Sequence, residues 1–246
     1  MEMSRRYFLS TPALVAGLGQ LEMIRLNAAD APLARRFFMD LSCGRIGLKA
    51  TFLESIDLAE GRRLAPRTFF RSRNFSYLQN FRSHAYRLRA CAQILKDHGQ
   101  KLGLEYLGPM TLWRRERHAF IHSLNEMKEL IAAIGTGNVG IQLDSWHWFT
   151  ADETEADLLT LRNEDIITVD LNDAPQGIAL DKQIDSAREL PAVTGVIPIK
   201  AFLDALRKIG YDGPVHAEPF NAALRALPRE EACAATSAAM KKAFAL

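Results

Sequence analysis

Apolar positions along the chain follow two different spacings, one typical of helices and one typical of strands. A helical pattern with apolar residues three and four apart begins after Ser76 and ends near Gly99. A second helical pattern runs from Phe120 to Ile134, and a third begins at Pro198 and ends before Gly210. Glycine directly after the last apolar position is typical of a helix end, because it adopts the left-handed conformation at little cost.

Short apolar runs between these helices predict strands. They alternate with the helical patterns, which is the arrangement of an α/β protein with a parallel sheet. Further helices are predicted around Thr51–Glu60, over Glu153–Leu161 and in the alanine-rich C-terminal stretch, and a long loop from Gln176 to Gly195. The basic stretch Gly61–Asn74 shows no clean period. The predicted strands are Arg36–Leu41, Lys101–Pro109, Asn138–Asp144, Asp165–Asp173 and Gly213–Phe220.

Composition narrows the class of protein. The chain has 246 residues, of which 48% are hydrophobic and 24% charged, enough for one domain with a sizeable core. A formal net charge of +2 does not indicate a nucleic-acid or anionic-lipid partner. Three cysteines lie far apart, in no disulfide or zinc spacing. Because no run of eighteen apolar residues occurs, no membrane span is expected.

The first residues differ from the rest of the chain. In Ser4–Gly19 two arginines precede a short apolar run, and the small-residue stretch Asn27–Ala31 follows. This order resembles a twin-arginine export signal. It predicts a signal segment over residues 1–31, one domain over residues 32–246 and an exported, periplasmic protein. The alternative is a basic amphipathic helix on a cytoplasmic protein.

Four successive predicted strands end in an acidic residue, namely Glu105, Asp144, Asp170 and Glu218. The carboxyl ends of parallel strands open on one face of a sheet or barrel, so these side chains can converge there. Two carboxylates about 4 Å apart repel by about 4 kcal/mol at an effective dielectric near 20, and a divalent cation relieves that repulsion. Oxygen ligands favour Mn²⁺ or Mg²⁺. For any one of these acids alone, a helix N-cap or loop anchor is the preferred interpretation, and the recurrence at four consecutive strands is what favours a metal site.

Other candidate residues surround this predicted site. Trp146 and Trp148 flank His147 in the sequence, and aromatic walls with a polar tip suit a sugar. Core packing is the alternative for all three. Arg188 is a candidate for binding a polar substrate group, with a surface ion pair as the plainer interpretation. His216 shares a strand face with Glu218 and either packs inside or supports the site.

Several stretches together resemble the xylose isomerase-like TIM-barrel family, whose members are mostly sugar phosphate isomerases or epimerases. The likeness covers roughly Arg36–Glu60 and Asn74 to the C-terminus. The stretches are "LGLEYLGPMTLW", "GIQLDSWHWF", "VDLNDAP" with "RELPAVTGVIPIKAFLDALRKIGYDGPVHAEPF", and "FFMDLSCGRIGLKATFLESIDLA".

The resemblance implies that Glu105, Asp144 and Glu218 bind a divalent ion and that His147 contacts the substrate. Asp170 stands where many relatives have a histidine, which leaves the fourth ligand open. The relatives' loop with glycine and glutamate after Leu190-Pro191 reads Ala192-Val-Thr-Gly195 here.

The resemblance also implies an abbreviated or incomplete barrel. Glu105 belongs on the fifth of eight strands, yet one convincing strand precedes it, so about three β/α units are missing or shrunken around Gly61–Asn74. Open strands and half a barrel interior invite pairing. We therefore hypothesise that a second subunit fills the gap, as a homo-oligomer, or that the chain is a shortened relative with weakened activity.

The family chemistry implied is isomerisation or epimerisation of a sugar, free or phosphorylated, by proton abstraction next to a carbonyl through an enediolate. Glu105 and Glu218 are the pair expected to move the proton. Two alternatives stay open: a dehydratase or lyase acting on keto-sugars or inososes, and a degenerate barrel that binds sugars without catalysis. An apurinic endonuclease of the same family needs several histidine ligands and a basic track, which the acidic strand ends do not offer.

Overall fold

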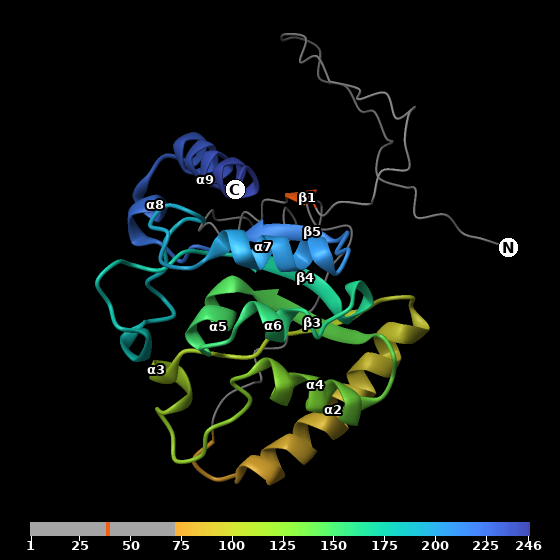
Figure 1. Ribbon diagram of the computed structural model, residues 1–246. Coiled ribbons are helices and arrows are strands. Elements are labelled where there is room, and N and C mark those ends of the chain that lie inside the picture. Colours follow the sequence, from red (N-terminus) through yellow and green to blue (C-terminus); the bar gives the residue numbers. More distant parts are fainter. Residues whose placement is uncertain (1–37, 40–71) are drawn as a thin grey trace, which may run out of the picture. The chain divides into compact units, whose positions relative to one another are not determined.

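The computed structural model describes residues 38–39 and 72–246, which belong to one compact unit running from Ala34 to Leu246 (Figure 1). The predicted export signal and the predicted helix over Thr51–Glu60 lie outside the described residues, as does all but the end of the basic stretch Gly61–Asn74. No helix within the described part is long and apolar enough to cross a membrane.

The described strands form one sheet in which every pairing is parallel. Its order is β1-β5-β4-β3-β2, so the first strand pairs with the last, as it does in a closed barrel. Within the described residues the sheet is open and has five strands, and the predicted barrel-like α/β fold is confirmed. The strands are β1 Phe38–Met39, β2 Leu102–Leu104, β3 Val139–Asp144, β4 Ile166–Leu171 and β5 Pro214–Ala217.

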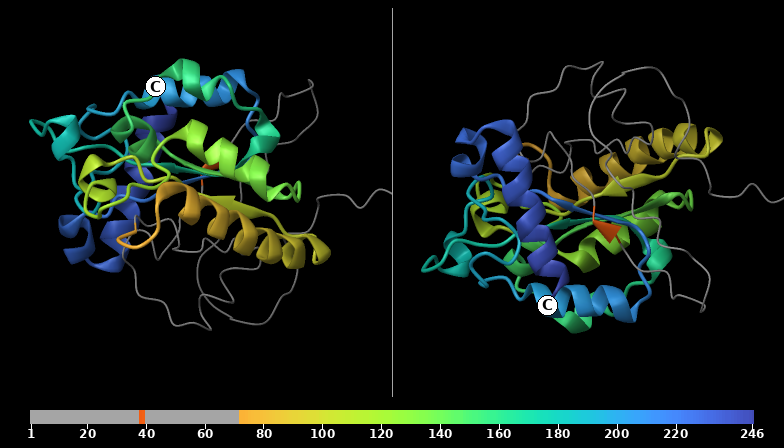
Figure 2. Two further views of the ribbon diagram at one scale, coloured as in Figure 1. Left: turned by 90° about the horizontal axis from the view of Figure 1, so that it is seen from below. Right: turned by 90° about the horizontal axis from the view of Figure 1, so that it is seen from above.

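Helices join these strands and pack on them. Figure 1 shows α5, α6 and α7 together on one face of the sheet, and Figure 2 shows the same layering from below and from above. The central strands β3 and β4 are buried along almost their whole length, and apolar residues alternate along them with Gln142, Asp144, Thr168 and Asp170. The helices are α2 Tyr77–Asp97, α3 Met110–Trp113, α4 Leu124–Ile134, α5 Ser145–Thr150, α6 Glu155–Leu158, α7 Ile199–Lys208, α8 Ala222–Ala226 and α9 Arg229–Phe244.

Local signals set most helix ends. The Ser76 side chain accepts a hydrogen bond from the backbone N–H of Gln79, and the Gln79 side chain accepts one from the Ser76 N–H, which forms a capping box before α2. Gly135 ends α4 with a φ of 69°, a conformation in which other residues are strained. The predicted start of α2 after Ser76 and the predicted end of α4 at Gly135 are therefore confirmed.

Two helix predictions need correction. The helix expected from Phe120 begins at Leu124, because the Ser123 side chain accepts the hydrogen bond from Glu126 N–H and caps the helix there. The helix expected over Glu153–Leu161 is the single turn of α6. A short helix that was not predicted, α5, starts directly after β3 and carries three of the candidate residues.

Candidate functional site

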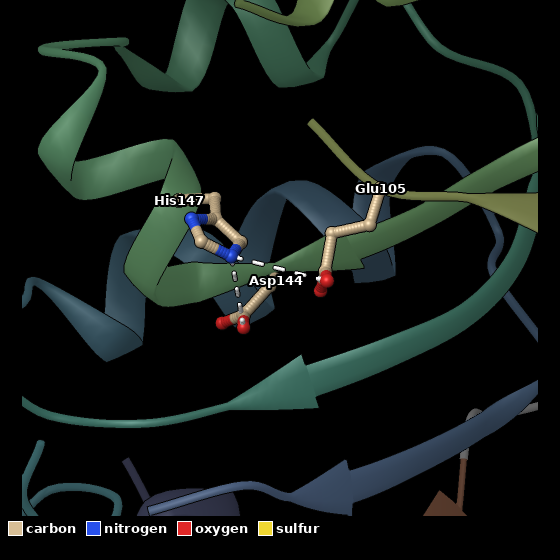
Figure 3. A group of neighbouring side chains, drawn as sticks. All are labelled: Glu105, Asp144 and His147. Atoms are coloured by element: carbon tan, nitrogen blue, oxygen red, sulfur yellow. Dashed lines mark ion pairs between the residues drawn. The ribbon is translucent and has the colours of Figure 1, made fainter. Parts of the chain in front are cut away.

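The four acids predicted from the strand ends lie at the carboxyl edge of the sheet. Asp144 ends β3, Asp170 is the last but one residue of β4, and Glu105 and Glu218 directly follow β2 and β5. Glu105, Asp170 and Glu218 each offer a carboxylate oxygen, and these oxygens lie within 4.8 Å of one another. Glu105, Asp144 and His147 form a second group of the same size (Figure 3). The structure therefore brings together side chains that are up to 113 positions apart in the chain.

Asp144 is fully buried and has three hydrogen-bonding partners. Its Oδ1 accepts hydrogen bonds from the backbone N–H of Trp146 and the side chain of Asn172, both at 2.8 Å. Its Oδ2 lies 2.7 Å from Nη1 of Arg188. Asp144 is thus the N-cap of α5, the plainer of the two sequence interpretations, and it also faces the acidic group.

Gln142 joins two of the other acids, and the sequence pattern did not single it out. Its amide donates to Oδ2 of Asp170 at 2.9 Å and to Oε1 of Glu105 at 3.2 Å. The period of two along β3 places Gln142 on the same face as Asp144, and this was the available signal. Beside them His216 lies 3.5 Å from Asp170 through Nδ1, so it contacts the acidic group from β5.

Arg188 occupies the space between three carboxylates. Its exposed fraction is 2%, so the surface ion pair expected from the sequence is wrong. The rings of Trp146 and Phe220 lie 5.3 and 4.7 Å from the guanidinium carbon and shield it from water. Burial opposes the charged form, but Asp144 and the neighbouring acids outweigh it and raise the pKa of Arg188 above its usual value.

Asp185 belongs to the same group, although the sequence pattern assigned it to a featureless loop. Its Oδ1 lies 2.6 Å from Nη2 of Arg188 and 4.0 Å from Nε2 of His147. Burial acts against ionisation, yet the charge of Arg188 lowers the pKa of Asp185 below its usual value. Its place three residues before Arg188 was the only hint in the sequence.

His147 reaches the acids from α5 and is 1% exposed. Figure 3 shows its Nε2 pointing toward Glu105 and Asp144, at 3.9 and 4.0 Å. On the other side of the ring, Gly108 N–H donates to Nδ1 at 3.3 Å. Burial lowers the pKa of His147 to about 4 despite the attraction of Asp144, so the imidazole is neutral near pH 7.

The two tryptophans do not flank His147 as walls. Trp148 packs against Phe202 of α7 at 5.3 Å between ring centroids and donates to the carbonyl of Thr154. Trp146 is fully buried behind Arg188. Consecutive residues of a helix point about 100° apart, and for this reason the side-by-side arrangement expected from the sequence does not occur.

Three of the four acids, Glu105, Asp170 and Glu218, form a group that could hold a divalent cation. All donors are carboxylate oxygens, Asp144 and Asp170 are fully buried, and three of the oxygens are close enough for one ion to contact them together. A cluster of this charge favours a hard ion.

Comparisons with known proteins point to one family. The model of the xylose isomerase-like TIM barrel matches residues 57–243. An inosose isomerase from Halalkalibacterium halodurans is 27% identical over 148 residues, which are 59% of this chain and 48% of that protein. The matched part of the chain thus spans about half the length of this curated relative.

Solved structures agree with this match. A xylose isomerase domain protein from Alicyclobacillus acidocaldarius is 36% identical, with a TM-score of 0.62 over 71% of this chain and 61% of that chain. The crystal structure of IOLI protein with a binding zinc atom is 21% identical, with a TM-score of 0.62 over 73% of this chain and 60% of the other. At that identity the second likeness shows the fold alone.

Proposed function

Because the chain belongs to the xylose isomerase-like TIM-barrel family, we propose that it is a divalent-metal-dependent isomerase or epimerase of sugars or related keto-polyols. The reaction proposed is transfer of a proton next to a carbonyl, through an enediolate. One observation carries the proposal: Glu105, Asp170 and Glu218, from three different strands, present carboxylate oxygens within 4.8 Å of one another.

The residues that would hold the ion are Glu105, Asp170 and Glu218, with Asp144 as the fourth candidate. When bound, the ion supplies positive charge beside the substrate carbonyl and so acidifies the neighbouring C–H. Mn²⁺ or Mg²⁺ suits an all-oxygen set, whereas the crystal structure of IOLI protein contains a zinc atom. Asp170 can take the place of the relatives' histidine, because its carboxylate oxygen binds Mn²⁺ or Mg²⁺ and only adds a negative charge.

The chain's own groups divide the remaining work. Glu105 and Glu218 approach the site from β2 and β5, which are separated by two strands, so they can address different sides of a substrate held between them. One glutamate takes the proton, and the other, in its protonated form, gives its own proton to the neighbouring carbon or to the opposite face of the same carbon. His147, neutral and fixed by Gly108, is suited to hydrogen-bonding a substrate oxygen.

The test is hydrogen exchange at the substrate carbon. The full chain is loaded with Mn²⁺ and incubated in D₂O with a panel of keto-hexoses, their phosphates and keto-inositols, and deuterium incorporation is followed by NMR. We expect Glu218→Gln to abolish incorporation while the far-ultraviolet circular dichroism is retained. Glu164→Gln, which removes an exposed carboxylate, is the control and keeps the wild-type rate.

Two results would contradict the proposal. Undiminished exchange in Glu218→Gln would contradict the proton-transfer role of Glu218. If elemental analysis finds no divalent metal bound to the chain, the proposed metal dependence is wrong. Product identification separates isomerisation from loss of water, and the second outcome would favour a dehydratase.

A further inference from the structure

The guanidinium of Arg188 is held in one position by contacts on all its nitrogen atoms. Nη1 lies 2.7 Å from Asp144 Oδ2 and 3.2 Å from Glu218 Oε2. Nη2 lies 2.6 Å from Asp185 Oδ1, and Nε donates to the backbone carbonyl of Asp185 at 3.0 Å. A single nitrogen of Arg188 thus bridges two residues that were predicted as metal ligands.

These contacts are shielded from water. The side chain of Arg188 is 1% exposed, and those of Asp144 and Glu218 are 0% and 11% exposed. Charges in such surroundings interact far more strongly than charges at a surface. Removal of the guanidinium would leave the two carboxylates buried without this partner.

A divalent ion would be attracted to the same two carboxylates. A second cation beside Nη1 would be repelled by the guanidinium and would have to share or displace its contacts. The oxygens that lie within 4.8 Å of one another include those of Glu105, Asp170 and Glu218, whereas Asp144 is grouped with Glu105 and His147. The bridge made by Arg188 lies between Asp144 and Glu218.

We propose that Arg188 is a built-in counter-cation that competes with the divalent ion for Asp144 and Glu218. It stabilises the carboxylate cluster in the metal-free protein, and it weakens the binding of the ion. Arg188 is therefore a positioning residue for the metal site. The part of this inference that concerns the ion rests on the proposed function, and the part that concerns the metal-free protein does not.

The first experiment measures Mn²⁺ binding to the full chain by isothermal titration calorimetry. We expect Arg188→Gln to bind Mn²⁺ at least about tenfold more tightly, because a like charge next to the ion is removed. Arg188→Lys keeps the charge, so its affinity for Mn²⁺ should stay closer to that of the wild type. Arg162→Gln, at an exposed ion pair, should leave the affinity unchanged. Unchanged or weaker binding in Arg188→Gln overturns the competition.

The second experiment measures thermal unfolding in the presence of a chelator, so its result does not depend on any metal. Arg188→Gln is expected to lower Tm by about 5 °C or more. Adding Asp144→Asn should recover at least half of that loss, because asparagine removes the charge and still caps α5.

A purely structural arginine would give the opposite pattern, with no recovery in the double variant. If Arg188→Gln does not fold, a soluble double variant supports the counter-cation and an insoluble one overturns it. If the wild type binds no Mn²⁺, the proposed function and the competition fail, and the chelator experiment still decides the role of Arg188 in the metal-free protein.

Discussion

The partly buried carboxyl group of Glu153 is expected to make the stability of the protein depend on pH. Glu153 contacts Tyr106, which lies next to the site. Its Oε2 accepts a hydrogen bond from the Tyr106 hydroxyl at 2.5 Å, and its Oε1 accepts one from Leu124 N–H at 2.6 Å. Tyr106 is fully buried and directly follows Glu105. Glu153 therefore fastens the chain at the end of β2 to the start of α4.

Burial raises the pKa of Glu153 to about 7, from its ordinary value of 4.5, even though the hydrogen bonds from Tyr106 and Leu124 favour the ionised form. The folded protein keeps this proton at pH values where the unfolded chain has lost it. The stabilising contribution is therefore fully present below pH 4.5 and is lost as the pH rises through 7. At about 1.4 kcal/mol for each pKa unit, the whole effect is about 3 kcal/mol.

The variant Glu153→Gln carries no titrating proton at this position, so it lacks this contribution to the pH dependence. Urea unfolding of the wild type and the variant at pH 5 and pH 8 gives the difference in their free energies of unfolding. We expect this difference to move in favour of the variant by about 2 kcal/mol from pH 5 to pH 8. The pH-independent cost of the substitution cancels in this comparison.

Glu164→Gln is the matched control, because it removes a carboxylate that is exposed and pairs with Arg162. The reasoning is refuted if the Glu153→Gln difference changes by less than about 0.5 kcal/mol over the same pH range. It is also refuted if Glu164→Gln shows the same change, since the effect would then not depend on burial.

Two further substitutions test the loops around the site. In Gly108→Ala the new Cβ would overlap the carbonyl oxygen of His147 and lie 2.7 Å from Oγ1 of Thr150. We expect the free energy of unfolding in urea to fall by about 2 kcal/mol and turnover to fall strongly. A fully stable and active variant would contradict this. Asp173 accepts hydrogen bonds from four backbone N–H groups, and Asp173→Ala should cost about 4 kcal/mol, whereas Asp181→Ala on the same loop should cost almost nothing.

Strand ends and their acids could be predicted because the signals are local. The periods of two and 3.6 are set by neighbouring residues, and the parallel arrangement follows from their alternation. Asp144 and Asp170 pair directly across β3 and β4 in the structure, as strands in the same register require. For these elements no information from distant parts of the chain was needed.

The environment of Arg188 and the direction of Trp148 could not be predicted in the same way. Both depend on how a loop or a short helix packs against elements far away in the sequence. Arg188 reaches Asp144 across 44 positions, and its neighbours in the sequence give no apolar period that would indicate burial. The short helix α5 was missed because the buried run "GIQLDSWHWF" contains no break between its strand part and its helical part.

The exposure of the four acids divides them into two pairs. Asp144 and Asp170 are fully buried, and each accepts at least one hydrogen bond from a neighbouring side chain. The side chains of Glu105 and Glu218 are 23% and 11% exposed, so they are less enclosed than the two aspartates. A group that exchanges a proton with a substrate must reach it, while a group that only holds an ion gains from rigid burial. This division supports the assignment of proton transfer to the two glutamates and of a purely ligating role to the two aspartates.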